Sequence, residues 1–304
     1  MPYYFSKIML STLTLFIDMK SRRILTEDFT MIIKNIYTVY FSPTGGTQKI
    51  AEALSDDLSQ FLHVPSQKID LTILANRQIS YDFDPHSLVI LAIPVYAGRI
   101  PNKLLPDLEK CLNGSGKTAI IPISVYGNRN YDEALREMLL LAEKHGFIPI
   151  GAAAMISQHA FSSHIGKDCP DFSDFESLKD FSSKIAEKIL NNRNVTAIAY
   201  DRNTPIGPYY TPLKSDHTPA RFLKAKPVTD MDKCNNCGIC VRKCPMGSIS
   251  ADHVADVFGI CIKCQACVKF CPAHAKYFTD ADFLSHVEML EHTYTDRKEA
   301  KFLF

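Results

Sequence analysis

The sequence Cys234-Asn-Asn-Cys237-Gly-Ile-Cys240-Val-Arg-Lys-Cys244-Pro245 returns further along the chain as Cys261-Ile-Lys-Cys264-Gln-Ala-Cys267-Val-Lys-Phe-Cys271-Pro272. Each copy has three cysteines separated by two residues, and then a fourth cysteine directly before a proline. Three thiolates at this spacing can bind three corners of an iron–sulfur cube, and the displaced fourth thiolate can reach the cube of the other copy. The duplication therefore predicts one small domain that holds two clusters and exchanges a ligand between its halves.

This exchange determines the expected ligand sets. Set one is Cys234, Cys237, Cys240 and Cys271, and set two is Cys261, Cys264, Cys267 and Cys244. Zinc is the alternative, because structural zinc sites also use pairs of cysteines two residues apart. The third cysteine of each copy, the Cys-Pro endings and the duplication favour two [4Fe-4S] clusters.

Composition limits the function classes. The chain has 304 residues, which is long enough for two domains. Of these residues 46% are hydrophobic and 22% are charged, which is ordinary for globular proteins. Its net charge of +1 provides no overall field for nucleic acid. The other two of the ten cysteines, Cys111 and Cys169, have no local partner and are expected to be bystander thiols. Dense cysteines beside a long cysteine-poor region indicate metal ligands in a reducing compartment, so we expect a cytoplasmic location.

The N-terminal residues need a separate interpretation. The apolar run from Ile8 to Ile17 ends at Asp18, without a small-residue cleavage site after it. The run is too short to span a bilayer, which takes about 20 apolar residues. We expect residues 1–32 to be an extension outside the fold, with an additional packed helix as the alternative, and we expect no membrane span.

Short β-branched runs alternate with longer helical patterns from Ile36 onwards. Strands are expected at 36–41, 67–71, 87–95, 117–125 and 147–156, and helices at 47–62, 102–111, 131–144 and 175–190. This alternation predicts an α/β domain over residues 33–198, with a doubly wound parallel sheet of five strands covered by helices on both faces. Its ligand should lie at the carboxyl ends of the strands.

Prolines mark the end of this domain. Five of them fall between Tyr200 and Val228, where proline fixes the backbone and removes a hydrogen-bond donor. We therefore expect an extended linker over residues 199–227 and the cysteine-rich domain, with a C-terminal tail, over residues 228–304.

The first expected strand leads into a loop that suits a phosphate. The loop reads Ser42-Pro43-Thr44-Gly45-Gly46-Thr47 and enters the helix directly. Hydroxyl groups, backbone N–H groups freed by glycine and the positive end of a helix dipole all favour an anion there. Neither the lysine of a nucleotide-binding P-loop nor a G-x-G-x-x-G dinucleotide motif is present. A purely structural helix cap is the alternative.

Two further loops place aromatic residues and glycine at the same end of the sheet. Glycine allows close approach of the backbone to a planar ring, and tyrosine offers a flat face for stacking. Each tyrosine taken singly could be an ordinary half-buried aromatic residue. The candidate cofactor-binding residues in these loops are Pro94, Val95, Tyr96, Ala97, Gly98, Arg99, Ser124, Tyr126, Gly127, Asn128, Arg129 and Tyr131.

These motifs resemble two known families. Residues 228–280 resemble bacterial two-[4Fe-4S] ferredoxins, and the loops resemble the FMN site of flavodoxins, so the whole chain resembles the flavodoxin–ferredoxin fusion family. The resemblance implies a flavodoxin-like sheet of strand order 2-1-3-4-5, an α+β ferredoxin domain, and FMN. The phosphate of FMN would then be held by Ser42, Thr44, Gly45, Gly46 and Thr47.

The chain departs from the flavodoxin pattern in two respects. It has no tryptophan to stack on the flavin, so tyrosine would have to serve. Arg99 and Arg129 lie in loops that are acidic in flavodoxins, and a cation near the ring would raise the potential of the flavin, unless either residue is a surface arginine.

The expected function is electron transfer between two [4Fe-4S] clusters and FMN, with unidentified redox proteins as donor and acceptor. One alternative is a flavin-dependent reductase that is fed through its clusters and acts on a small molecule. Another is a ferredoxin with a flavin-free, flavodoxin-like docking domain.

Overall fold

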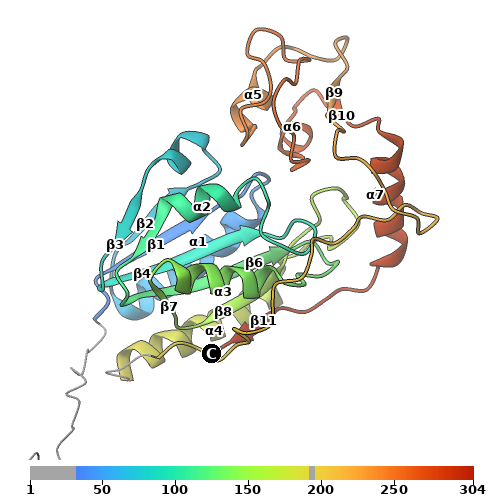
Figure 1. Cartoon of the computed structure of the whole chain (residues 1–304). Helices are drawn as coiled ribbons and strands as arrows, with labels where there is room; N and C mark the ends of the chain where they lie inside the picture. The colour runs from blue at the N-terminus through green and yellow to red at the C-terminus, as the bar shows by residue number, and fades with distance from the viewer. Residues whose placement is uncertain (1–31, 192–195) are drawn as a thin grey trace, which may run out of the picture.

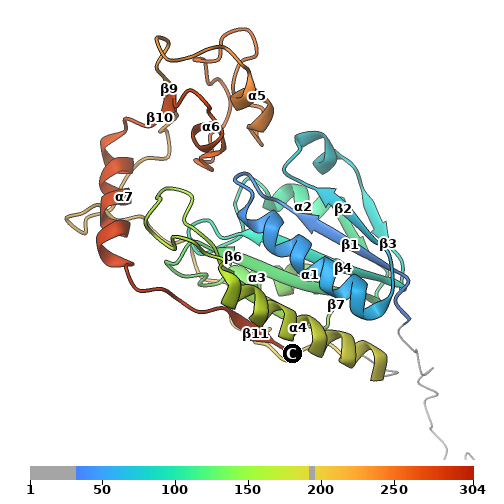
Figure 2. The ribbon, with the colours of Figure 1, turned by 180° about the vertical axis from the view of Figure 1, so that it is seen from behind.

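The computed structural model describes residues 32–191 and 196–304. The extension expected at residues 1–32 thus lies, except for Ile32, outside the described residues. Figures 1 and 2 show a larger body built around a sheet, and a smaller lobe beyond one end of its strands.

A parallel sheet forms the centre of the body. Its main strands are β1 (Asn35–Tyr40), β2 (Ser66–Asp70), β4 (Ser87–Pro94), β6 (Thr118–Tyr126) and β8 (Ala152–Ile156). They lie in the order β2-β1-β4-β6-β8, with all four neighbouring pairs parallel. The predicted flavodoxin-like order 2-1-3-4-5 is therefore confirmed.

Two short strands extend the sheet to seven. The strand expected at 147–156 is interrupted: β7 (Phe147–Pro149) pairs with the start of β6, and β8 pairs with its end. At the break, the backbone of Gly151 lies against the side chain of Ile185. A Cβ on Gly151 would be only 2.4 Å from Ile185 Cδ1, which explains why the residue is glycine. The second addition, β11 (Lys301–Leu303), pairs antiparallel with β8 and brings the C-terminal segment back to the body.

Helices cover both faces of the sheet. On one face lie α1 (Gly46–Leu62) and α4 (Phe172–Asn191), and on the other lie α2 (Leu105–Cys111) and α3 (Ala134–Lys144), as Figures 1 and 2 show from opposite sides. Successive strand residues alternate between these two cores, so that Ile36 and Tyr40 pack with α1 whereas Val39 and Phe41 pack with α2. A minor pair of strands, β3 (Tyr81–Phe83) and β5 (Leu112–Gly114), and the 3-10 helix η1 (Leu74–Gln78) complete the body.

The lobe is built from short elements. It contains β9 (Val228–Thr229), α5 (Ile239–Lys243), α6 (Ala266–Lys269) and β10 (Lys276–Tyr277), with β9 and β10 antiparallel. Helix α7 (Ala281–Thr293) follows, starting where the Asp280 side chain accepts a hydrogen bond from the Phe283 N–H, and runs back toward the body (Figure 1). Within residues 32–191 and 196–304, no helix is long and apolar enough to cross a membrane.

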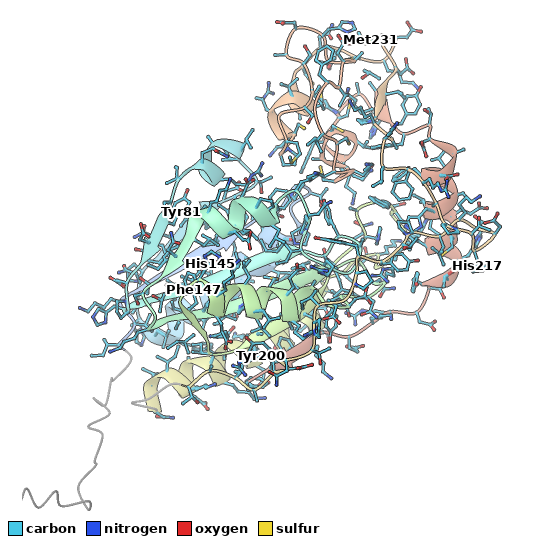
Figure 3. All side chains as sticks on the ribbon, viewed as in Figure 1. Tyr81, His145, Phe147, Tyr200, His217 and Met231 are labelled. Carbon is cyan, nitrogen blue, oxygen red and sulfur yellow. The ribbon has the colours of Figure 1, made fainter. Side chains whose placement is uncertain are left out.

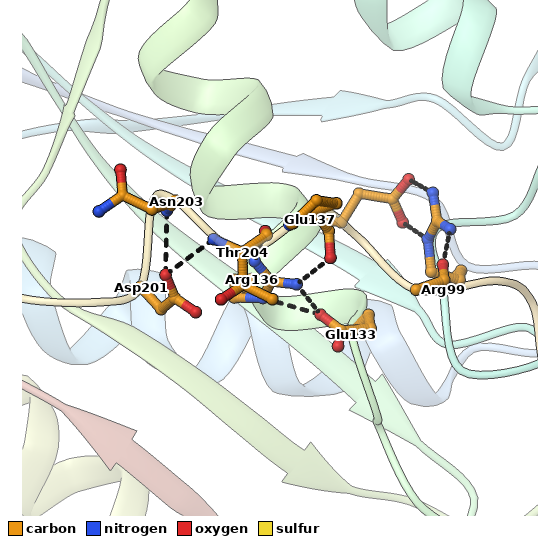
Figure 4. A network of polar contacts seen from close by, with 9 residues as sticks. Arg99, Glu133, Arg136, Glu137, Asp201, Asn203 and Thr204 are labelled. Atoms are coloured by element: carbon orange, nitrogen blue, oxygen red, sulfur yellow. Dashed lines mark hydrogen bonds and ion pairs between the residues drawn. The ribbon is translucent and has the colours of Figure 1, made fainter.

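Arginines of the body hold the linker in place. Arg136 donates hydrogen bonds to the carbonyl oxygens of Thr204 and Pro205, and Arg99 donates one to the Gly207 carbonyl (Figure 4). Arg136 also forms an ion pair with Glu133, just before α3, and Arg99 forms one with Glu137, within α3. The linker thus lies along the body instead of crossing open solvent.

Candidate cluster and cofactor site

The structure brings the cysteines together in the two sets expected from the exchanged motif. Cys234, Cys237, Cys240 and Cys271 line one pocket. Cys244, Cys261, Cys264 and Cys267 line a second pocket. In each pocket the fourth cysteine comes from the other copy of the motif.

The two copies of the cysteine motif have the same backbone conformation at equivalent residues. Left-handed backbone occurs at Asn236 and Gly238 in the first copy, and at the equivalent residues Lys263 and Gln265 in the second. Alternation of right- and left-handed residues turns successive N–H groups into a concavity that favours an anion. The Ser248 N–H lies 3.4 Å from the Cys244 sulfur, and the equivalent Ala275 N–H lies 3.3 Å from the Cys271 sulfur. Such N–H to sulfur hydrogen bonds stabilise thiolate ligands of a cluster.

The four thiols of each set line one pocket. A [4Fe-4S] cube binds one thiolate at each of its four irons, so the lining of each pocket fits such a cube.

Burial makes the thiols of set two poor acids. It raises the pKa of Cys267 to about 12 and also raises the pKa values of Cys261 and Cys264, with the neighbouring thiols adding to the effect. Because the ligand is the thiolate, charge of this kind inside the lobe needs bound iron to compensate it.

The phosphate-loop residues lie at the start of α1. The Ser42 hydroxyl accepts a hydrogen bond of 2.9 Å from the Gln48 N–H, and the Ser42 N–H donates to the Thr72 hydroxyl. Gly45 has a φ of 92°, and a Cβ there would meet no atom within 4 Å, so the loop is open on this side. Thr44 and Gly46 are half-buried and Thr47 is buried.

The loop after β4 reaches the lobe. Pro94, Val95 and Ala97 are half-buried, and a tight turn joins the Tyr96 N–H to the Arg99 carbonyl at 3.0 Å. The half-buried Tyr96 lies close enough to Cys264 and Cys261 for these thiols to add to the burial that raises its pKa well above the ordinary value. Set two therefore faces the carboxyl ends of the parallel strands, which we call the rim.

The arginine of this loop is engaged elsewhere. The Arg99 guanidinium forms a two-pronged ion pair with Glu137 and stacks over the Tyr209 ring at 4.7 Å. Gly98, behind it, is buried. The side chain of Arg99 thus positions the linker.

Side chains of the loop after β6 hold the C-terminal segment. The Tyr126 hydroxyl donates to the Glu299 carbonyl at 2.8 Å. The Asn128 amide donates to the carbonyls of Tyr294 and Asp296 and accepts from the Lys298 N–H.

The other residues of this loop are also packed. Ser124 is fully buried within β6, Tyr131 packs against the Tyr126 ring, and Arg129 pairs with Asp132 and stacks over Tyr210. Gly127 is half-buried, and a Cβ there would lie 2.6 Å from the His159 ring, so glycine allows this ring to pack against the loop.

Two site residues were not assigned a role from the sequence. Burial lowers the pKa of His159, which packs against Gly127, to about 3, so its imidazole is neutral. Arg77 is buried between body and lobe, pairs with Asp107 at 2.9 Å and donates to the Pro245 carbonyl beside Cys244. No local sequence pattern predicts the role of Arg77, because Pro245, its partner in the lobe, lies 168 residues further along the chain.

Comparison with known proteins supports the nature of the lobe. Residues 233–276 match the family described as 4Fe-4S dicluster domain. Over 50 residues the chain is 40% identical to pyruvate synthase subunit PorD of Methanothermobacter marburgensis, a match that covers 16% of this chain and 60% of that relative.

Solved structures with similarity to the body include flavodoxins. The flavodoxin of Streptococcus pneumonia TIGR4 is 19% identical to this chain, with a TM-score of 0.38. The match covers 51% of this chain and 99% of the flavodoxin. A flavodoxin from the domain Archaea is 18% identical, with a TM-score of 0.34, and covers 52% and 99%. At these scores the fold assignment rests on the strand order of the sheet itself. The chain thus joins a body with the flavodoxin-like strand order to a C-terminal segment that matches the 4Fe-4S dicluster domain family, a combination that fits a flavodoxin–ferredoxin fusion.

Proposed function

We propose that the chain is an electron-transfer iron–sulfur flavoprotein that passes electrons between two [4Fe-4S] clusters and FMN. Clusters carry single electrons and a flavin can take two, so such a protein converts between one- and two-electron chemistry. The observation that carries the proposal is the contact of set two with the body: Ile262, between Cys261 and Cys264, packs against the core on the α2 face, and Lys269 donates a hydrogen bond to the His159 carbonyl.

The two cysteine sets differ in their access to solvent. Cys264 and Cys267 of set two are buried, whereas Cys237 of set one is exposed. Met231, three residues before set one begins, lies at the outer end of the lobe (Figure 3). We therefore assign set one to exchange with a redox protein partner, and set two to exchange with the rim. The reducing chemistry of both sets fits a cytoplasmic location.

The phosphate loop supports FMN. The first N–H groups of a helix have no partner within it, and α1 begins at Gly46, next to the open side of Gly45. The Ser42 oxygen accepts from the Gln48 N–H, which fixes this side chain at the start of α1, and we assign the half-buried Thr44 hydroxyl, next to Gly45, as a side-chain donor to the phosphate.

Removal of this donor tests the flavin assignment. Thr44→Val should weaken FMN binding by about 1.5–3 kcal/mol, the value of a hydrogen bond to a charged group, and should leave iron and sulfide unchanged. The measurement is fluorescence titration of deflavinated protein with FMN and with riboflavin, which should bind much more weakly. Ser163→Ala, an exposed hydroxyl change away from the loop, is the control. Equal affinity for FMN and riboflavin would mean that the loop is only a helix cap.

The same preparation separates the two alternatives. Visible spectra of protein purified without oxygen should show flavin bands over the iron–sulfur absorbance; their absence would favour a flavin-free docking domain. Steady-state turnover with small-molecule acceptors, at rates above those with protein partners, would favour a reductase.

A further inference from the structure

A lysine is buried in the lobe between the two cysteine sets. Lys276, in β10, is only 3% exposed and lines the pocket of set one together with Cys240. Its ammonium group donates a hydrogen bond to the carbonyl of Val254, which packs in the same small core as Cys240 and Cys267. The side chain thus reaches the centre of the lobe, where both sets contribute a sulfur.

The ammonium group has no carboxylate partner. Among the described residues, none of the ion pairs involves Lys276, although Lys233 of the same lobe pairs with Asp230 on the surface. An isolated buried cation costs several kcal/mol, so such groups are retained where another charge compensates them. The ligand groups around the ammonium group are sulfurs: Lys276 and Cys240 line the same pocket, and Val254, which accepts the hydrogen bond of Lys276, packs with Cys240 of set one and Cys267 of set two.

We propose that Lys276 is the shared counter-charge of both clusters and raises the reduction potential of each. This inference rests on the two-cluster composition proposed above. A cluster held by four thiolates is an anion and gains negative charge on reduction, so a fixed cation nearby stabilises the reduced form more than the oxidised form. Because one ammonium serves both sets, it shifts the two potentials in the same direction.

Neutralising the lysine tests the proposal. In Lys276→Met, both clusters should become harder to reduce, with the ratio of reduced to oxidised cluster at a fixed potential falling about tenfold, equivalent to about 59 mV for a one-electron couple. Lys276→Arg keeps the charge and should restore potentials close to those of the unaltered protein. The readout is a redox titration of the whole protein followed by electron paramagnetic resonance.

Two lysines of the lobe serve as matched controls. The Lys263 ammonium binds the Leu223 carbonyl on the outer side of set two and acts on Cys261, so Lys263→Met should shift the set-two cluster alone. Lys224 is exposed, and Lys224→Met should shift neither cluster.

Each result decides the proposal. Unchanged or raised potentials in Lys276→Met, or a shift of one cluster only, would overturn it. If Lys276→Met fails to assemble its clusters, assembly in Lys276→Arg supports a need for the charge, and failure of both variants shows a need for the lysine's shape, which overturns the proposal. Iron and sulfide analysis of the unaltered protein separates these results from failure of the two-cluster composition itself.

Discussion

The body and the lobe are stabilised by different means. In the body, strands β4 and β6 and helix α1 bury aliphatic side chains such as Ile90, Ile121 and Leu54 completely, in two continuous cores. The lobe has a small core in which Cys240 and Cys267 are two of the four buried members, and a second cluster, which includes Phe278, lies where the lobe meets the linker and α7. Apolar burial of about 25 cal/mol per Å² can stabilise the body, whereas we expect the lobe to depend on its metal ligands for much of its stability. The difference predicts that the body folds without cofactors and that the lobe folds around them.

Removal of iron should therefore have the largest effect on stability, and this effect should be confined to the lobe. We expect chelation under anaerobic, reducing conditions to abolish amide hydrogen-exchange protection throughout residues 228–280, because thiols buried without a metal have little else to hold them. Protection in β1, β4 and β6 should persist. Hydrogen exchange followed by mass spectrometry checks both parts, and a lobe that stays protected without iron would contradict the contrast drawn here.

The exchanged fourth cysteine gives the next largest effect. Cys244→Ala should remove or convert the cluster of set two and leave set one intact, so the iron content should fall from about eight atoms per chain toward four. Cys271→Ala is the matched variant and should affect set one. Iron analysis and the resonance spectra of the two clusters measure the outcome. Loss of the set-one cluster in Cys244→Ala would show that each motif binds its own cluster.

The sequence predicts some of these features and not others, for a physical reason. The parallel sheet follows from short-range alternation of strands and helices, its strand order from the resemblance to flavodoxins, and the cysteine sets from the spacing of a motif and its duplicate. The roles of Asn128 and Tyr126 depend instead on a C-terminal segment that returns to the body more than 160 residues later, at separations of 166 and 173 residues. A loop with tyrosine and glycine is equally compatible with a ring or with such a segment, and no spacing within the loop predicts its contacts with Tyr294, Asp296 and Glu299.

Substitution of Arg77, which lies in the contact between body and lobe, should lower the stability of the protein strongly for a single side chain. Arg77→Leu removes the hydrogen bonds to the carbonyls of Leu71 and Pro245 and leaves Asp107 without its ion-pair partner. Asp107 is partly exposed and can be hydrated, so we expect a loss of about 2–3 kcal/mol in the free energy of unfolding, at the low end for a broken buried pair.

Denaturant unfolding measures this loss, and Lys68→Ala is the control. Lys68 forms an exposed pair with Glu52, and its removal should cost less than about 1 kcal/mol. If Arg77→Leu were as mild as the control, other contacts, such as those of Ile262 and Lys269 with the body, would be enough to position the lobe.

The smallest effect concerns Tyr126 and decides what the loop after β6 does. Tyr126→Phe removes one hydrogen bond to the Glu299 carbonyl and should lower the free energy of unfolding by about 0.5–1.5 kcal/mol, with FMN affinity unchanged. The alkaline range adds a second signature. Burial raises the pKa of Tyr126 to about 12, so the unfolded chain loses this proton first, and the contribution of the neutral hydroxyl is present below about pH 10 and disappears as the pH rises toward 12. The stability of the unaltered protein should thus fall more steeply than that of Tyr126→Phe between pH 10 and 12, whereas equal slopes together with weaker FMN binding would return Tyr126 to the flavin.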